Sequence, residues 1–249
     1  MSDDELAEVL DAAVAAVAAA FASVSERGVV TDRPGQYHLD VVTDDAAVEV
    51  LVGAGLGVVS EESGVHHPER ELMVVLDPID GSTNASRRVP WFATSLCAVD
   101  GDGPRAAVVV NQASGERFRA RRGGGATCDG RPVEPSGCQR LDEAIIGVSG
   151  LPGAHWGWAQ FRALGAAALD LCYVADGRLD GYVALSGGLA PWDYLGALLV
   201  CRESGTEIID AEGRALVVLD HDARRAPVAG SAPLVAQLLE ASGRGRDGS

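Results

Sequence analysis

The chain has no lysine, since all 20 of its basic residues are arginines. P-loop proteins need a lysine on the phosphates, pyridoxal enzymes need one for a Schiff base, and protein kinases need one on a strand. These three classes are therefore excluded. Cysteine is also scarce, and the five cysteines are widely spaced with no C-x-x-C pair. Their spacing excludes the common zinc and dithiol motifs and favours a reducing, cytoplasmic location.

Basic charge is in short supply, with 20 basic against 36 acidic residues and a net charge of −16. Because a nucleic-acid backbone is polyanionic, we expect no nucleic-acid partner. The N-terminus carries Asp3, Asp4 and Glu5 where a secretory signal would be basic. The alanine-rich apolar run at residues 12–22 is shorter than the ~20 residues that span a bilayer. The sequence thus predicts neither export nor membrane anchoring.

The chain does contain enough apolar residues for a large core, because 47% of its 249 residues are hydrophobic and 22% are charged. Helical patterns are predicted at residues 3–25, 46–53, 165–176, 192–203 and 233–241. Strand patterns are predicted at residues 57–60, 72–76, 94–99, 106–110, 116–120, 144–148, 180–185 and 206–209, and near Val228. Turn residues at 101–104 and 113–115 join three of these strands, which indicates an antiparallel meander.

The alternation of helices and strands predicts a layered α/β fold. There is no internal repeat and no clean linker, so we expect a single domain over residues 1–249. Its two packed α/β halves are expected at about 1–140 and 141–242. The polar segment 243–249 is expected to be a disordered tail.

Acidic residues follow two of the predicted strands. Glu61 and Glu62 come directly after the strand that ends at Ser60. The strand that ends at Leu76 runs into the octapeptide Asp77-Pro78-Ile79-Asp80-Gly81-Ser82-Thr83-Asn84. Carboxylates brought this close repel one another unless a cation lies between them, and no lysine exists to provide it. The octapeptide therefore predicts a site for a hard, oxygen-binding cation such as Mg²⁺.

A further acid, Asp193, follows Trp192 at the start of a predicted helix. Taken alone, Asp193 or Glu61 is more often a helix cap or a solvated turn residue. The uninterrupted acidic string after a buried strand reverses that preference. We interpret these acids together as one metal-binding site.

At this point the sequence resembles the inositol monophosphatase family of magnesium-dependent, lithium-sensitive phosphatases. The matching strings are Glu61-Glu62-Ser63, the octapeptide 77–84, residues 162–170, Asp180-Gly181-Tyr182 and Trp192-Asp193. The resemblance implies alternating α-β-α-β-α layers like those of the related fructose bisphosphatases. It also implies hydrolysis of a small phosphomonoester by metal-activated water, and a homodimer.

The resemblance also implies roles for individual residues. Two Mg²⁺ ions would be held by Glu61, Asp77, the Ile79 carbonyl, Asp80 and Asp193. A third ion would contact Glu61 and an acid near the second helix, best matched by Asp45, with Asp44 as the alternative. The phosphate and the rest of the substrate would be bound by Gly81, Ser82, Thr83, Gly165, Ala166 and Asp193. Catalysis would depend on Asp80 and on Glu61 with the Ser82 hydroxyl, which would orient and deprotonate the attacking water.

Two segments depart from the family pattern. Residues 182–191 contain no acid, whereas inositol-phosphate enzymes carry a sugar-binding Glu there, and residues 150–160 are shorter than usual. An inositol monophosphate or a similar polyol phosphate is the preferred substrate. Histidinol phosphate, fructose bisphosphate and a nucleotide 3′-phosphate stay open, as does a non-catalytic, ligand-binding homologue.

Overall fold

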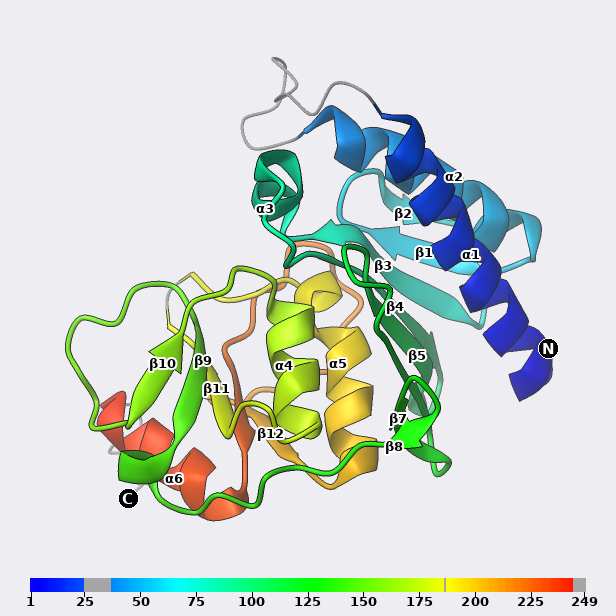
Figure 1. Ribbon diagram of the computed structural model, residues 1–249. Coiled ribbons are helices and arrows are strands. Elements are labelled where there is room, and N and C mark those ends of the chain that lie inside the picture. The colour runs from blue at the N-terminus through cyan, green and yellow to red at the C-terminus, as the bar shows by residue number, and fades with distance from the viewer. Residues whose placement is uncertain (25–36, 186, 244–249) are drawn as a thin grey trace.

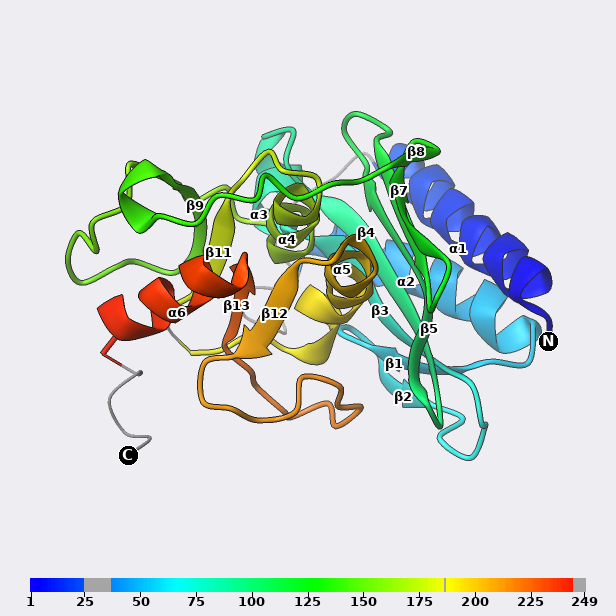
Figure 2. The same ribbon diagram turned by 90° about the horizontal axis from the view of Figure 1, so that it is seen from below.

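The computed structural model describes residues 1–24, 37–185 and 187–243 (Figure 1). The elements stack as a helix pair, a sheet, a second helix pair, a second sheet and a last helix (Figure 2). This order confirms the layered α/β fold predicted from the sequence. Residue 25, predicted to end the first helix, and residues 244–249 of the predicted tail lie outside the described residues.

The first layer consists of α1 (Asp3–Ser23) and α2 (His38–Gly53). α1 begins with a capping box, in which the Ser2 hydroxyl accepts from the Glu5 amide and the Glu5 carboxylate accepts from the Ser2 amide. Its buried residues fall at helical spacing and pack with α2 on the outer face of the first sheet. They are Leu6, Leu10, Ala13, Val14 and Val17.

By length and composition α1 could also cross a membrane, because an 18-residue window of this 21-residue helix is apolar, which is longer than the predicted run at 12–22. Core helices of soluble proteins pass the same test. The packing of Leu6, Leu10 and Val17 against the sheet accounts for its apolar side within this fold.

The first sheet has eight strands in the order β2-β1-β3-β4-β5-β6-β7-β8. Their bounds are β1 (Gly57–Ser60), β2 (Gly64–His66), β3 (Met73–Asp80), β4 (Ala93–Asp100), β5 (Gly103–Asn111), β6 (Arg117–Arg121), β7 (Gly125–Cys128) and β8 (Arg131–Pro132). Only β1 and β3 pair in parallel; β4, β5 and β6 form the predicted antiparallel meander.

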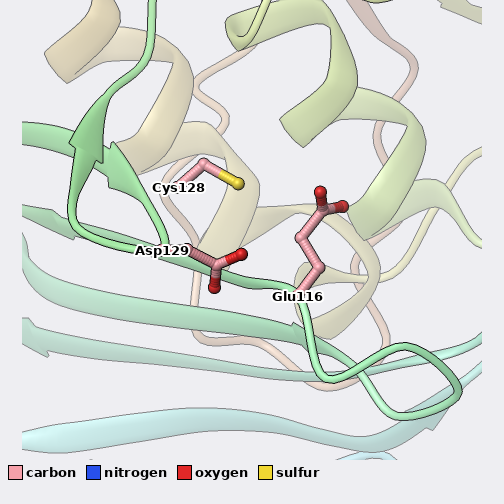
Figure 3. A group of neighbouring side chains, drawn as sticks. All are labelled: Glu116, Cys128 and Asp129. Atoms are coloured by element: carbon pink, nitrogen blue, oxygen red, sulfur yellow. The ribbon is translucent and has the colours of Figure 1, made fainter.

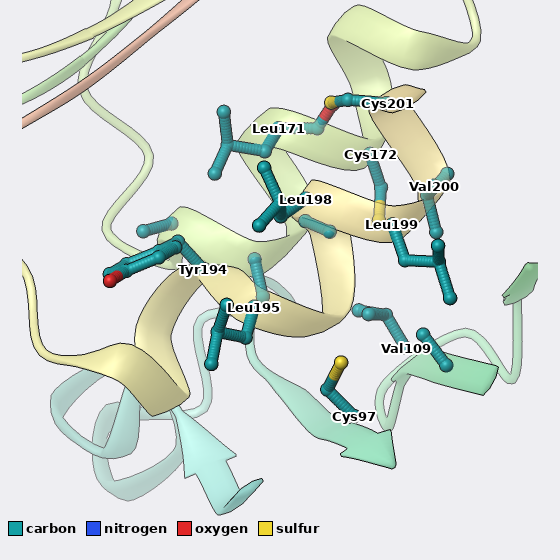
Figure 4. Close-up of a cluster of buried hydrophobic side chains, with 14 of the residues drawn as sticks. Cys97, Val109, Leu171, Cys172, Tyr194, Leu195, Leu198, Leu199, Val200 and Cys201 are labelled. Atoms are coloured by element: carbon teal, nitrogen blue, oxygen red, sulfur yellow. The ribbon is translucent and has the colours of Figure 1, made fainter. Parts of the chain in front are cut away.

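The middle layer contains α4 (Ala167–Ala175) and α5 (Pro191–Ser204). Both helices are buried on almost every side because they lie between the two sheets. Their apolar side chains pack against each other and toward Cys97 and Val109 of the first sheet (Figure 4). Their N-termini lie at the same end of the molecule as the carboxyl end of β3 (Figure 1). The short helix α3 (Ser82–Arg87) follows β3 directly. This layer therefore brings two helix N-termini to the predicted acidic site.

The second sheet has five strands in the order β10-β9-β11-β13-β12. Their bounds are β9 (Ile145–Ser149), β10 (Gln160–Arg162), β11 (Gly181–Ala184), β12 (Glu207–Asp210) and β13 (Pro227–Gly230). A single 3₁₀ turn, η1 (Leu141–Glu143), precedes this sheet, and α6 (Ala232–Ala241) covers its outer face (Figure 2). Residues 150–159 form a loop, in keeping with the shortened segment seen in the sequence.

Two predicted boundaries next to the acidic residues are wrong. The second helix begins at His38 instead of residue 46, because the Asp40 carboxylate accepts from the Tyr37 amide and closes the N-terminus there. Strand β3 continues through Asp80 instead of ending at Leu76, with an irregular register against β4 between Asp77 and Asp80.

Candidate functional site

The two acidic segments meet because β1 and β3 are parallel neighbours. Ser60 pairs with Leu76, so the next residues, Glu61 and Asp77, leave the same edge of the sheet side by side. The Glu61 amide donates to the Leu76 carbonyl at 3.2 Å and continues the ladder by one residue. The sequence prediction that both strand ends deliver acids to one place is borne out by this pairing.

The Pro78-Ile79 dipeptide carries the bulge between Asp77 and Asp80. Pro78 has no amide hydrogen to donate to the ladder, and its carbonyl accepts from a side chain of β4, the Thr94 hydroxyl, at 2.8 Å. Gln112 in turn donates to the Thr94 oxygen at 2.8 Å. These bonds hold the main chain of the bulge, including the Ile79 carbonyl predicted to bind metal.

The other two predicted acids are oriented by helix N-termini. The Asp80 Oδ2 atom accepts from the Ala168 amide at 2.7 Å, in the first turn of α4. The Asp193 Oδ2 atom accepts from the Ala190 amide at 2.7 Å, where α5 begins. Asp193 therefore caps its own helix and also faces the acidic cluster, so its capping role is compatible with the predicted metal-binding role.

The pKa values of the four acids in the cluster are raised, mainly by burial. Burial, followed by the neighbouring Asp193 and Glu62 carboxylates, raises the pKa of Glu61 to about 8. Burial also raises the pKa of Asp193 to about 6. The pKa values of Asp77 and Asp80 lie well above the ordinary range, first because both are buried and then because of the acids beside them. Within the described residues, no arginine forms a salt bridge with any of these four acids.

A divalent cation fits this donor set. The Asp77 Oδ1 atom is buried and has no hydrogen-bond partner, and an unpaired carboxylate oxygen is costly unless a cation takes it. No three of the four carboxylates come within 4.8 Å of one another in the described structure. Each ion would therefore take few protein carboxylates, and water, a carbonyl and phosphate would complete its octahedron, as Mg²⁺ prefers.

The predicted phosphate loop lies at the start of α3. Gly81 has φ +88°, and a Cβ atom there would come within 2.9 Å of the Gly165 carbonyl oxygen, so only glycine fits. The first amides of a helix have no intrahelical acceptor. Those of Gly81 and Ser82 have no hydrogen-bond acceptor within the described residues. Both amides are thus available to an anion beside the carboxylates.

Gly165 and Ala166, predicted to contact substrate, lie against this loop. Gly165 has φ +89°, and a Cβ atom there would approach the Asn84 Nδ2 atom to 3.2 Å. That Asn84 nitrogen donates to the Leu164 and Trp91 carbonyls, both at 2.8 Å. Asn84 therefore ties α3 to the segment before α4 and fixes the walls of the phosphate loop.

The side chains of Ser82 and Thr83 point to the first layer. Ser82 lies near Asp40, a buried acid of α2 that the sequence analysis did not single out. Burial raises the pKa of Asp40 to about 7, and its Oδ1 atom has no hydrogen-bond partner. The Thr83 hydroxyl lies 3.2 Å from the Tyr37 hydroxyl. α2 thus adds a further acid, Asp40, to those that lie at the ends of β1 and β3.

Of the two acids predicted as candidates for the third ion, Asp45 is exposed and Asp44 is buried. The side chain of Asp45 is exposed on α2, whereas Asp44 is buried and accepts a hydrogen bond from the Ser60 hydroxyl. Since α2 begins at His38, Asp40 and Asp44 are one turn apart on its inner face. The alternative named from the sequence, Asp44, is therefore the residue that faces the carboxyl end of β1.

Replacing Asp44 by alanine is expected to lower the free energy of unfolding by about 1–3 kcal/mol, because the Ser60 hydroxyl loses its buried acceptor. The matched change Asp45→Ala removes an exposed acid and should stay within about 0.5 kcal/mol. Urea unfolding of both variants tests this difference. Equal losses would show that the two acids are equally buried in solution.

The sequence analysis also missed His221 and Arg224, which reach the site from the loop between β12 and β13. The His221 Nε2 atom lies 3.1 Å from the Ser60 carbonyl oxygen, and its ring lies 4.5 Å from that of Trp192. Neither residue stands in a motif, and each is more than 25 positions from Asp193 in the chain. Only the folded arrangement of the second sheet brings them here.

A different cluster, Glu116, Cys128 and Asp129, has three ligand atoms within 4.8 Å of one another (Figure 3). The Glu116 carboxylate already accepts from Arg178 at 2.7 Å and from the Tyr173 hydroxyl at 2.9 Å. Burial, followed by the neighbouring acids, raises the pKa of the Cys128 thiol to about 11, so it stays protonated and binds metal poorly. This cluster joins the first sheet to α4 and has a structural role.

A glycine run and a pair of tryptophans have structural roles in the fold. The turn before β7 contains the glycine run 123–125, and the amides of Gly123 and Gly125 donate to the Glu203 carboxylate, both at 2.9 Å. The glycine run therefore forms a turn, and the anion that its amides hold is a carboxylate of α5. Trp158 is buried in the core between the second sheet and α6, and Trp156 packs beside it.

Comparison with known proteins agrees with this geometry. The model of the inositol monophosphatase family matches residues 5–244. Nus factor SuhB of Salmonella typhimurium is 36% identical over 172 residues, which span 63% of each chain. A fructose-1,6-bisphosphatase/inositol-1-monophosphatase of Archaeoglobus fulgidus is 32% identical over 225 residues, 87% of each chain. The crystal structure of extragenic suppressor protein suhB from Bartonella henselae superposes with a TM-score of 0.81, at 27% identity, over 98% of this chain and 100% of that one. The chain belongs to the inositol monophosphatase family.

Proposed function

We propose that this protein is a magnesium-dependent phosphatase that hydrolyses a small phosphate monoester, an inositol monophosphate or a similar polyol phosphate. The observation that carries the proposal is the meeting of four acids with the free amides of Gly81 and Ser82. Asp77 and Asp80 are buried, Glu61 and Asp193 are half-buried, and within the described residues no arginine forms a salt bridge with any of them. Carboxylates alone would repel a phosphate. A site that gathers both therefore needs divalent cations between them.

The proposed mechanism assigns metal binding, phosphate binding and proton transfer to different residues. Glu61, Asp77, the Ile79 carbonyl, Asp80 and Asp193 would hold two ions, and Asp44 or Asp40 replaces Asp45 as the candidate near a third. Bound magnesium would neutralise the phosphoryl oxygens and lower the pKa of a nearby water. The amides of Gly81 and Ser82 hold the phosphate, and Glu61 accepts the proton of the attacking water. Asp193 stands on the side from which the alcohol leaves.

The direct test is phosphate release with and without magnesium across four compounds: myo-inositol 1-phosphate, histidinol phosphate, fructose 1,6-bisphosphate and adenosine 3′,5′-bisphosphate. We expect one of them to be turned over, and chelation of magnesium to lower its rate at least about a hundredfold, because the ions offset several kcal/mol of charge repulsion. Turnover that survives chelation would contradict the metal-dependent mechanism.

The rival function is a non-catalytic homologue that keeps the fold and binds a ligand or partner. The similarity to proteins named Nus factor SuhB is the observation that favours it. No release from any phosphomonoester, together with intact metal binding, would support that rival. A homodimer, a cytoplasmic location and the absence of nucleic-acid and membrane partners stay predictions from the sequence.

A further inference from the structure

The loop between β12 and β13, residues 211–226, forms one wall of the site and is fixed at both ends. At its start, buried Asp210 accepts from Arg214 through both carboxylate oxygens at 3.0 Å, and also from the Ala226 amide at 2.7 Å. In its middle, the buried Tyr194 hydroxyl of α5 donates to the Leu216 carbonyl at 2.7 Å. The loop is therefore anchored to the helix that carries Asp193.

Arg224 is held by this loop beside the metal-binding acids. Its guanidinium carbon lies 5.6 Å from the centre of the Trp192 ring, and Trp192 directly precedes Asp193. Its Nη1 atom donates to the His221 carbonyl at 3.1 Å and the Ala223 carbonyl at 2.8 Å. The charge of Arg224 is near enough to Asp193 to oppose the burial that raises the pKa of that acid.

The rest of the guanidinium is uncommitted. Within the described residues, its Nε and Nη2 atoms make no hydrogen bond, and Arg224 forms no salt bridge. The side chain is exposed, so these donors reach the solvent beside the site. Arginine offers a fixed fork of donors that suits carboxylate and phosphate groups. The position thus presents an ordered, unpaired cation next to the leaving-group side.

The facing segment offers no competing acid. The positions from Tyr182 to Pro191 contain no Asp or Glu, so a polyol hydroxyl finds no carboxylate there. Gly188 packs directly on the loop, since a Cβ atom there would come within 3.1 Å of the Arg224 Cβ and of the Arg225 carbonyl oxygen. Leu189 and Arg225 also pair as a β-bridge. The junction presents two arginines, and the guanidinium of Arg225 donates to the Ala215 carbonyl at 2.7 Å and to the Arg224 carbonyl at 3.0 Å.

We propose that Arg224 binds an anionic group, a carboxylate or a second phosphate, on the alcohol half of the substrate. The inference rests on the proposed phosphatase function and changes the preferred substrate from a neutral polyol phosphate to a phosphomonoester with a second negative group. The two hydrogen-bonded carbonyls and the Trp192 ring hold the guanidinium in place before substrate binds. Little side-chain ordering is then needed on binding.

The test compares substrates that differ only in the second anionic group. One pair is glycerol 1-phosphate and 3-phosphoglycerate, which adds a carboxylate; the other is fructose 1-phosphate and fructose 1,6-bisphosphate, which adds a phosphate. We expect kcat/KM to be higher for the anionic member of at least one pair, and the pair concerned identifies the group. Arg224→Met should lower kcat/KM for that member by about ten- to a hundredfold, mostly through KM, because the contact is remote from the reacting phosphate.

Arg224→Met keeps an unbranched apolar chain over Trp192 and removes only the charge and donors. The matched control is Arg140→Met, which removes an exposed arginine before η1 and should change neither pair. Equal loss for the neutral and anionic members in Arg224→Met, or no loss for either, would overturn the inference while leaving the phosphatase function standing. Absence of phosphate release from all four compounds and from inositol phosphate would overturn the proposed function and this inference with it.

Discussion

Replacing Asp80 by asparagine is expected to reduce turnover by about a thousandfold or more while the protein still folds. Asp80 is buried at the end of the β3 bulge, and the α4 amide of Ala168 fixes one of its oxygens toward the acidic cluster. Asparagine keeps the shape and an acceptor for that amide but loses the negative charge that holds a cation. A loss of about 4 kcal/mol of metal-derived stabilisation corresponds to about three orders of magnitude in rate.

The measurement is steady-state phosphate release at saturating magnesium, with far-UV circular dichroism and a thermal melt to confirm folding. The matched control is Asp102→Asn, which changes an exposed acid in the turn between β4 and β5 and should leave the rate unchanged. Asp80→Asn with wild-type turnover at wild-type magnesium would show that Asp80 does not hold the metal. A rate loss restored by excess magnesium would instead place Asp80 at a weak, dispensable site.

The part of the site carried by contiguous sequence could be predicted because it follows a buried strand. Asp77 and Asp80 were assigned together since an apolar strand runs straight into them, and β1 pairs beside β3 as the position of Glu61 required. Asp193 was found through its place at a helix start, which the Ala190 bond confirms. Local periodicity and a short motif therefore determined four of the acids.

The errors arose where tertiary contacts override local signals. Thr43 and Asp44 resemble a helix cap in the sequence, yet α2 begins at His38 and both residues are buried inside it. The Thr43 hydroxyl donates to the Leu39 carbonyl at 2.7 Å, one turn earlier in the same helix. This bond satisfies the hydroxyl inside the helix, so Thr43 does not need to cap a helix start. Because the helix starts earlier than predicted, Asp40 and Asp44 lie on its buried face and Asp45 is exposed.

The loop that carries His221 and Arg224 could not be assigned by any local pattern. It has no regular secondary structure, and its place depends on Asp210, on the Tyr194 hydroxyl and on contact with β1 from the other sheet. Such long-range bonds leave no periodicity in the sequence. The acids proposed to bind metal are therefore predictable from the sequence, whereas Arg224, proposed to select the substrate, can be placed only from the fold.

Magnesium is expected to stabilise the protein strongly at pH 8 and weakly at pH 5. In the metal-free chain, burial and neighbouring acids raise the pKa of Glu61 from 4.5 to about 8, and burial raises that of Asp193 from 3.8 to about 6. The folded state therefore keeps protons that the unfolded state has released. The contribution of these two acids to the stability of the metal-free protein is fully present below their unfolded pKa values near 4 and is lost as the pH rises toward 8.

Cations bind the ionised acids, so protons compete with magnesium at low pH and no longer do so at pH 8. At a magnesium concentration about 100 times its Kd, binding adds about 2.7 kcal/mol, or an increase of roughly 5–10 °C in Tm for a chain of this size. Thermal melts with magnesium or with chelator at pH 5 and pH 8 measure the two shifts, and Asp80→Asn serves as the variant that should lose the shift at pH 8. Equal shifts at both pH values, or an undiminished shift in Asp80→Asn, would mean that magnesium binds elsewhere on this acidic surface and that the buried carboxylates have another role.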